Sequence, residues 1–304
     1  MTVPSSTTTT LHWTAGFRAS CLHAAAALAH GQVLADARLA EAIAVPAQEL
    51  RQAIQAAGLP RDPLWRQLLG LSAIVDSLRD LAERAVARCC GVAVAERAAS
   101  MLVPPLAAIE SAVRSVYPNL LAELTLREGP LREQWEARGP GLLRNITRWT
   151  DPRLMPSEAK VVLVHPALGG GGTAHLAYNL VHIEAVLTNP VPDLPEVLRL
   201  GWLLAQLNLD LPAFSEQVHG ARLATIAELA MLPATLQAAE EVELATNGPE
   251  SIDLALQAWN VLTPPEVDPV EVIWRWWSTY LETRPRWDIA FTALDRMLRS
   301  DSAA

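Results

Sequence analysis

One stretch decides the fold class: KVVLVH at residues 160–165, which is β-branched and apolar on both faces, as an interior strand is. Four glycines follow at residues 169–172. In LVHIEAVL, residues 180–187, two sets of side chains alternate with the period of a strand: Val181, Ile183, Ala185 and Leu187 in one set, and Leu180, His182, Glu184 and Val186 in the other. We therefore expect strands at about 160–167 and 180–188, with the glycines forming a flexible hairpin turn between them.

Helical patterns precede these strands. From residue 14 to about 126, apolar residues recur at helical spacing, as Leu64 and Leu68 do. Pro104 and Pro105 should break this run, because proline interrupts helical hydrogen bonding. No fixed period repeats along the chain, so a solenoid is not expected.

The region after residue 128 combines helices with the two strands. Glycine and proline at 129–130 and 139–141 should separate two short helices. Residues 195–207 are apolar nearly all round the helix, which predicts a buried central helix. The expected fold class is mainly α with a small β-sheet (α+β). It would comprise a flexible tail at 1–13, a helical module at 14–128 and an α+β region at 129–304.

Composition excludes several classes of protein. Of 304 residues, 51% are hydrophobic and 19% are charged, which excludes a disordered chain. The net charge of −9 argues against a nucleic-acid partner. The absence of 18 consecutive apolar residues argues against a membrane span. Three cysteines are too few for a disulfide framework, so a reduced, cytoplasmic location is expected.

The glycine run at residues 169–172 invites comparison with phosphate-binding loops, because bare backbone amides can approach an anion. The following residues, Thr173, Ala174 and His175, supply neither G-x-x-x-x-G-K-[ST] nor G-x-G-x-x-G. We therefore expect no nucleotide, and no other cofactor is indicated.

Four polar side chains near the strands are candidate metal ligands: His165, His175, His182 and Glu184. On a strand, His182 and Glu184 would point the same way, about 7 Å apart. Such a set could serve a metal-dependent hydrolase. The alternative is that they are solvated or hydrogen-bonded residues of a half-buried strand, which is the commoner arrangement.

Tryptophans cluster near the C-terminus. Trp274 and Trp277 share one helix face, Trp276 turns away from it, and Trp287 follows. Core packing is the commoner reason for such a cluster. Any exposed remainder of Trp274, Trp277 and Trp287 would form a partner-binding patch beside arginines.

The order of elements from Pro156 onward resembles the zincin metallopeptidase scaffold: an interior strand, a glycine-rich connection, an edge-like strand at 180–187 and a central helix. The zincin helix carries H-E-x-x-H, whereas residues 196–202 here contain no histidine. The resemblance therefore implies a scaffold without the metal site. It places Glu196, Arg199 and Gln206 in a polar stripe on the cleft floor, with Glu196 as the expected partner of a buried Arg199.

The function expected from these patterns is a non-catalytic scaffold that binds a protein or peptide partner, through the central cleft or the C-terminal tryptophans. One alternative is the metal-dependent hydrolase that uses His165, His175, His182 and Glu184. Another is a structural subunit of a helical assembly. The sequence leaves the partner and the oligomeric state open.

Overall fold

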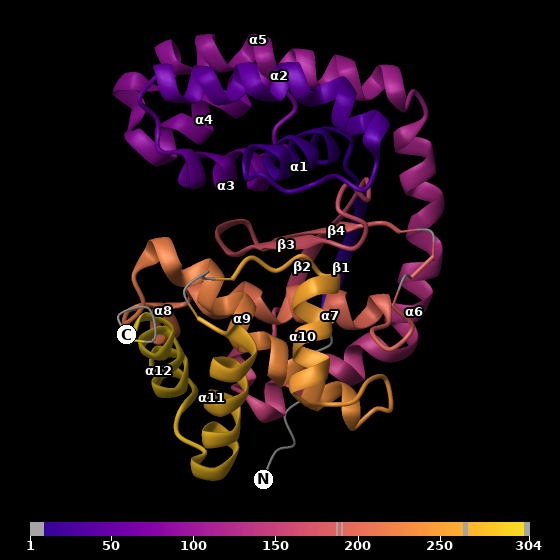
Figure 1. Ribbon diagram of the computed structural model, residues 1–304, viewed down its shortest axis with the longest axis vertical. Helices are drawn as coiled ribbons and strands as arrows, with labels where there is room; N and C mark the ends of the chain where they lie inside the picture. The colour runs from indigo at the N-terminus through magenta and orange to yellow at the C-terminus, as the bar shows by residue number, and fades with distance from the viewer. Residues whose placement is uncertain (1–8, 187, 190, 264–266, 301–304) are drawn as a thin grey trace.

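The structure is a computed structural model that describes residues 9–186, 188–189, 191–263 and 267–300. These residues form twelve α-helices and one four-stranded mixed sheet, which confirms the expected fold class. Figure 1 shows α1 to α5 on one side of the sheet and α7 to α12 on the other.

Five helices make up the N-terminal layer: α1 (Phe17–Ala29), α2 (Ala37–Ala56), α3 (Arg61–Ser72), α4 (Leu78–Cys90) and α5 (Val92–Val116). The next helix, α6 (Leu120–Trp149), runs along one side of the molecule (Figure 1). Its first turns place Leu120 and Leu124 in the apolar core of the N-terminal layer, and Leu131 and later residues join a second core. Because both clusters bury residues of α6, this helix ties the two layers together.

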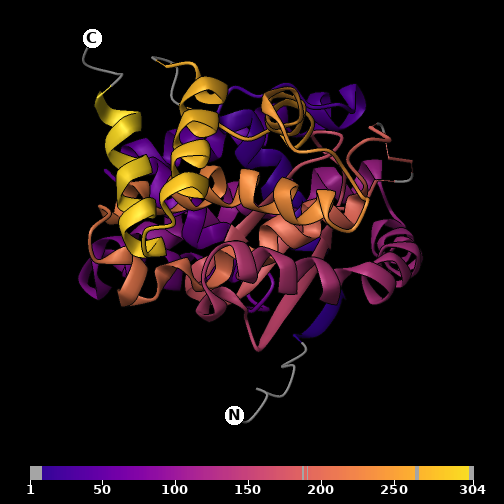
Figure 2. The same cartoon turned by 90° about the horizontal axis from the view of Figure 1, so that it is seen from below.

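Six helices make up the C-terminal layer: α7 (Glu196–Gln206), α8 (Pro212–Ser215), α9 (Gly220–Glu240), α10 (Pro249–Ala258), α11 (Pro269–Thr283) and α12 (Trp287–Ser300). Three short 3₁₀ turns lie at Pro152–Leu154, Leu176–Tyr178 and Leu207–Asp210. Viewed from below, α11 and α12 lie side by side (Figure 2). The predicted central helix is confirmed as α7, in which every residue after Glu196 is buried.

The sheet has the strand order β1-β2-β4-β3. Its strands are β1 (Thr10–Ala15), β2 (Glu158–Val164), β3 (Gly172–His175) and β4 (Leu180–Glu184). Both predicted strands are therefore present, as β2 and β4, and they occupy the interior of the sheet. β1 is parallel to β2, β2 is parallel to β4, and β3 is antiparallel to β4.

Two expectations about the strands were wrong. Residues 10–13, expected in a flexible tail, belong to β1, because their backbone pairs with β2; residues 1–8 lie outside the described part. The glycines do not form a hairpin between β2 and β4, since those strands are parallel and need a crossover. The crossover contains β3, which forms the edge of the sheet next to β4. β4 is therefore an interior strand, and not the edge-like strand that the resemblance implied.

The prolines do not break the helices as predicted. Pro104 and Pro105 lie inside α5, and Pro130 and Pro140 lie inside α6. A proline frees the carbonyl one turn earlier, at residues 100, 101, 126 and 136 respectively. All four of these residues are exposed, so water can satisfy the freed carbonyls and the helices continue.

By length and composition, α5 is the one helix in the described ranges that could cross a membrane. It packs on α2 and α4 and buries Leu102, Leu106 and Ile109 in the N-terminal core. A core helix passes the same test, so this is weak evidence for a membrane span.

Candidate functional site

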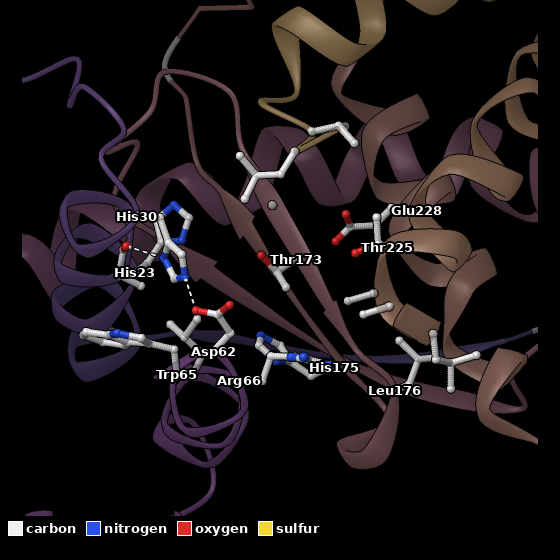
Figure 3. A pocket seen from close by; sticks show the side chains of 18 of the residues that line it. His23, His30, Asp62, Trp65, Arg66, Thr173, His175, Leu176, Thr225 and Glu228 are labelled. Atoms are coloured by element: carbon white, nitrogen blue, oxygen red, sulfur yellow. Dashed lines mark hydrogen bonds and ion pairs between the residues drawn. The ribbon is translucent and has the colours of Figure 1, made fainter. Parts of the chain in front are cut away.

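A cavity of about 490 Å³ opens between the two helical layers, alongside β3. Figure 3 shows its walls: α1 and α3 on one side, β3 in the middle and α9 opposite. Its lining includes the polar and aromatic side chains of His23, Trp65, Arg66, His175, Trp202 and Glu228. The cavity thus combines segments that lie far apart in the sequence.

β3 lines the cavity as an edge strand with one side unpaired. The Glu184 amide donates to the Gly171 carbonyl at 3.1 Å, and the register continues through Thr173 opposite His182. In an antiparallel ladder the bonded positions alternate, so the N–H and C=O groups of Gly172 and Ala174 point away from β4. No other hydrogen bond within the described part of the chain reaches these backbone groups. The cavity therefore contains an open sheet edge.

The loop before β3 is held by a single buried carboxylate, that of Glu184. One oxygen accepts from the amide of Leu168 at 2.7 Å, and the other accepts from those of Gly170 and Gly171 at 2.7 and 2.9 Å. His23 Nε2 lies 2.7 Å from the first oxygen. Burial alone would raise the pKa of Glu184, but the hydrogen bond and charge of His23, with the backbone amides, lower it to about 2. The carboxylate is therefore ionised at neutral pH.

Arg199 holds the same loop from α7, on the C-terminal side of the sheet. Its guanidinium donates to the carbonyl of Gly171 at 3.1 Å and to the backbone carbonyl of Glu184 at 2.7 Å. It also pairs with the Glu196 carboxylate at 2.5 Å, which confirms the expected partner. Gly170 completes the fit, because a Cβ there would lie 2.7 Å from the Ala258 carbonyl oxygen. The start of β3 is thus positioned by charged groups on β4 and α7.

The predicted polar stripe on α7 does not line the cavity. Arg199 turns into the loop and is 1% exposed. Gln206 is buried and donates to the Trp202 carbonyl of its own helix at 3.1 Å. Glu196 pairs with Arg199. The three residues do not form a cleft floor because α7 is packed against α6, α9 and the sheet; of its side chains, Trp202 borders the cavity, and Glu196 lines a separate hollow beside α6.

The C-terminal tryptophans are core residues. Trp277 and Trp287 are buried, and Trp274 is partly buried. Trp276, expected to turn away, is also buried, and its Nε1 donates to the Ala290 carbonyl at 2.7 Å. With Tyr280 the buried rings pack at centroid separations of 5.1 to 6.3 Å. Trp277 and Trp287 therefore have no exposed surface for a partner.

Only two of the four candidate metal ligands come together. His175 Nε2 lies 3.2 Å from His182 Nδ1. Both carboxylate oxygens of Glu184 are occupied by the loop, and the His165 ring packs on Tyr117 at a centroid distance of 4.4 Å. Among the described residues, no group of three or more His, Cys, Asp or Glu side chains is placed to hold a metal ion.

The histidine pair is buried and neutral. Burial, with the nearby charge of His23, lowers the pKa of His175 to about 3. Burial also lowers the pKa of His182 well below its usual value, helped by the charges of His175, His23 and Lys160. His182 Nε2 has no hydrogen-bond partner in the described part of the protein. Protonation of either ring would place an uncompensated charge in the interior.

Sequence reasoning missed two cavity residues, His23 and Glu228. His23 lies in an alanine-rich helix and gains its partner Glu184 only through the tertiary fold. Glu228 points from α9 into the cavity (Figure 3). Burial raises the pKa of the Glu228 carboxyl to about 7, against the opposing charge of Arg66. Neither residue stands in a sequence motif that could have singled it out.

We predict that Glu184→Gln destabilises the protein by about 3 to 5 kcal/mol, because it leaves buried amides and His23 without their charged acceptor. Urea unfolding followed by circular dichroism measures the change. Glu133→Gln, on an exposed part of α6, should change stability by less than about 0.5 kcal/mol. A loss below about 1 kcal/mol for Glu184→Gln would contradict the role given to this carboxylate.

We also predict that acid weakens the fold through the histidine pair. The folded-state pKa values lie below the usual 6.5, so stability present above pH 6.5 is lost as the pH falls. Each histidine should contribute about 1.4 kcal/mol of loss between pH 7.5 and 5.5. Urea unfolding measures the free energy of unfolding of the wild type and of His182→Leu across this pH range. In His182→Leu this free energy should fall by about 1.4 kcal/mol less than in the wild type. The same pH dependence in both proteins would refute the prediction.

Searches for similar proteins add no relative to this geometry: no family model, no curated protein and no solved structure matches the chain. The resemblance to the zincin scaffold therefore stays a prediction.

Proposed function

We propose that this protein is a binding scaffold that takes up an extended segment of a partner protein as an additional strand beside β3. The observation that carries the proposal is the unpaired edge of β3 inside a cavity. Strand addition uses backbone groups for affinity and neighbouring pockets for specificity. Here the outward N–H and C=O groups of Gly172 and Ala174 would supply the affinity, and the side chains of the cavity walls would supply the specificity.

The rigidity of β3 supports this proposal. Its preceding loop is held by the Glu184 carboxylate and by Arg199, so the free backbone groups are fixed before any partner arrives. A preorganised site loses less conformational entropy on binding. Trp65, Trp202 and Trp259 border the same cavity but are at most 4% exposed, so they form part of its packed wall.

Neither alternative has a comparable observation behind it. The hydrolase requires His165, His175, His182 and Glu184 to converge, whereas Glu184 and His165 contact other groups. A structural subunit of a helical assembly would bury the C-terminal tryptophans between copies, whereas Trp277 and Trp287 are buried within this chain. A cytoplasmic location belongs to the same proposal, and the three unpaired cysteines support it.

We predict that Ala174→Pro lowers peptide affinity at least about tenfold, because it removes one outward N–H and no hydrogen bond to β4. The probe is a displayed library of random peptides selected on the immobilised protein, with enriched sequences measured by fluorescence polarisation. Ala174→Gly keeps the N–H and should bind within about twofold of the wild type. Circular dichroism checks that both variants fold.

A second measurement does not depend on any variant. Amide hydrogen exchange of Ala174 in the wild-type protein should slow when an enriched peptide binds, because its N–H becomes bonded. Peptides that bind without protecting Ala174, or with equal affinity for Ala174→Pro, would refute strand addition. Failure to enrich any peptide above a heat-denatured control would also refute it.

A further inference from the structure

We infer that the bound segment carries a basic side chain, best an arginine, which pairs with the carboxylate of Glu228. This inference rests on the proposed function and specifies the chemistry of its ligand.

Glu228 faces β3 across the cavity. It lies on α9 one turn after Thr225, and both side chains are directed inward (Figure 3). Gly172 and Ala174 lie on the side of β3 that faces α7: a Cβ on Gly172 would lie 2.7 Å from Leu203, and Ala174 belongs to the same core as α7 and α9. A strand added beside β3 would send alternate side chains to this side of the sheet. Those side chains would therefore enter the space in front of Glu228.

The carboxylate of Glu228 has no partner in the described part of the protein. No hydrogen bond or ion pair reaches its oxygens, although its backbone carbonyl accepts from Trp202 Nε1 at 2.9 Å. The arginine on the opposite wall, Arg66, donates instead to the Ala221 carbonyl at 3.4 Å. The other acid of that wall, Asp62, already pairs with Arg61 and His30.

Glu228 is partly buried, and a partly desolvated carboxylate without a partner carries a cost that a cation relieves. The raised pKa of Glu228, about 7, reports the same imbalance from burial. Arginine suits this carboxylate better than lysine, because its planar guanidinium can donate two parallel hydrogen bonds to the two carboxylate oxygens.

The test compares two labelled peptide pools about nine residues long, long enough for a strand. Flanking positions carry random uncharged residues, and the central residue is arginine in one pool and citrulline, its neutral isostere, in the other. Fluorescence polarisation measures both pools against the wild type, Glu228→Gln, Ala174→Pro and the exposed-site control Glu133→Gln.

The wild type and Glu133→Gln should bind the arginine pool at least about tenfold more tightly than the citrulline pool. In Glu228→Gln that ratio should fall to about one, and Ala174→Pro should weaken both pools. Equal binding of the two pools to the wild type, with both weakened by Ala174→Pro, would overturn the basic ligand and leave strand addition standing. If Glu228→Gln still prefers the arginine pool as strongly as the wild type does, the pairing with Glu228 is overturned and strand addition stands. If neither pool binds the wild type, both proposals fail.

Discussion

The hydrogen bonds to the buried carboxylate of Glu184 are the constraint on which the cavity depends. Three loop amides and His23 donate to two oxygens that are shielded from water. This carboxylate joins α1, from the N-terminal layer, to the loop that starts β3. Without an anion at this place, the amides of Gly170 and Gly171 would be buried without acceptors, and the loop would have to open. The open edge of β3 therefore depends on a charge at the end of the neighbouring strand.

This arrangement explains the glycine run in physical terms. Glycine-rich loops gather backbone amides around anions, and phosphate-binding loops use them for ligands. Here the anion is a side chain of the same protein, so the loop is satisfied internally. The loop amides that bond Glu184 hold β3 in place. The outward backbone atoms of β3 are the groups that the proposed partner would bind. A search for a phosphate motif at residues 169–172 could not find this role, because the acceptor lies on β4 and becomes a neighbour only after folding.

The parts of the fold that sequence predicts are those fixed by local pattern. β2 and α7 are recognisable because burial on all sides leaves mainly apolar runs, and β4 is recognisable because its residues alternate with the period of a strand. β1 is not recognisable, because residues 10–15 become a strand by pairing with β2, far along the chain. The single helix α6, which passes through both Pro130 and Pro140, likewise depends on exposure of the residues whose carbonyls are freed, which the sequence does not state. Within the site, the Glu196–Arg199 pair was predictable from helical spacing, whereas the contacts of Glu184 with His23 and the position of Glu228 depend on tertiary packing.

An unpaired strand edge is a hazard for a protein, because it can template pairing with any other chain. Here the unpaired backbone groups belong to a strand of four residues, recessed between α3 and α9, so a second folded sheet cannot approach it edge to edge. A single extended segment can enter the same space. The helical layers would then act as a filter, because they admit one strand and exclude a sheet. Under the proposed function, Glu228 would add a second filter, since a segment that buries this carboxylate without a cation would lose the binding free energy that a basic residue supplies. Shape and charge at this cavity would thus select for the same class of partner.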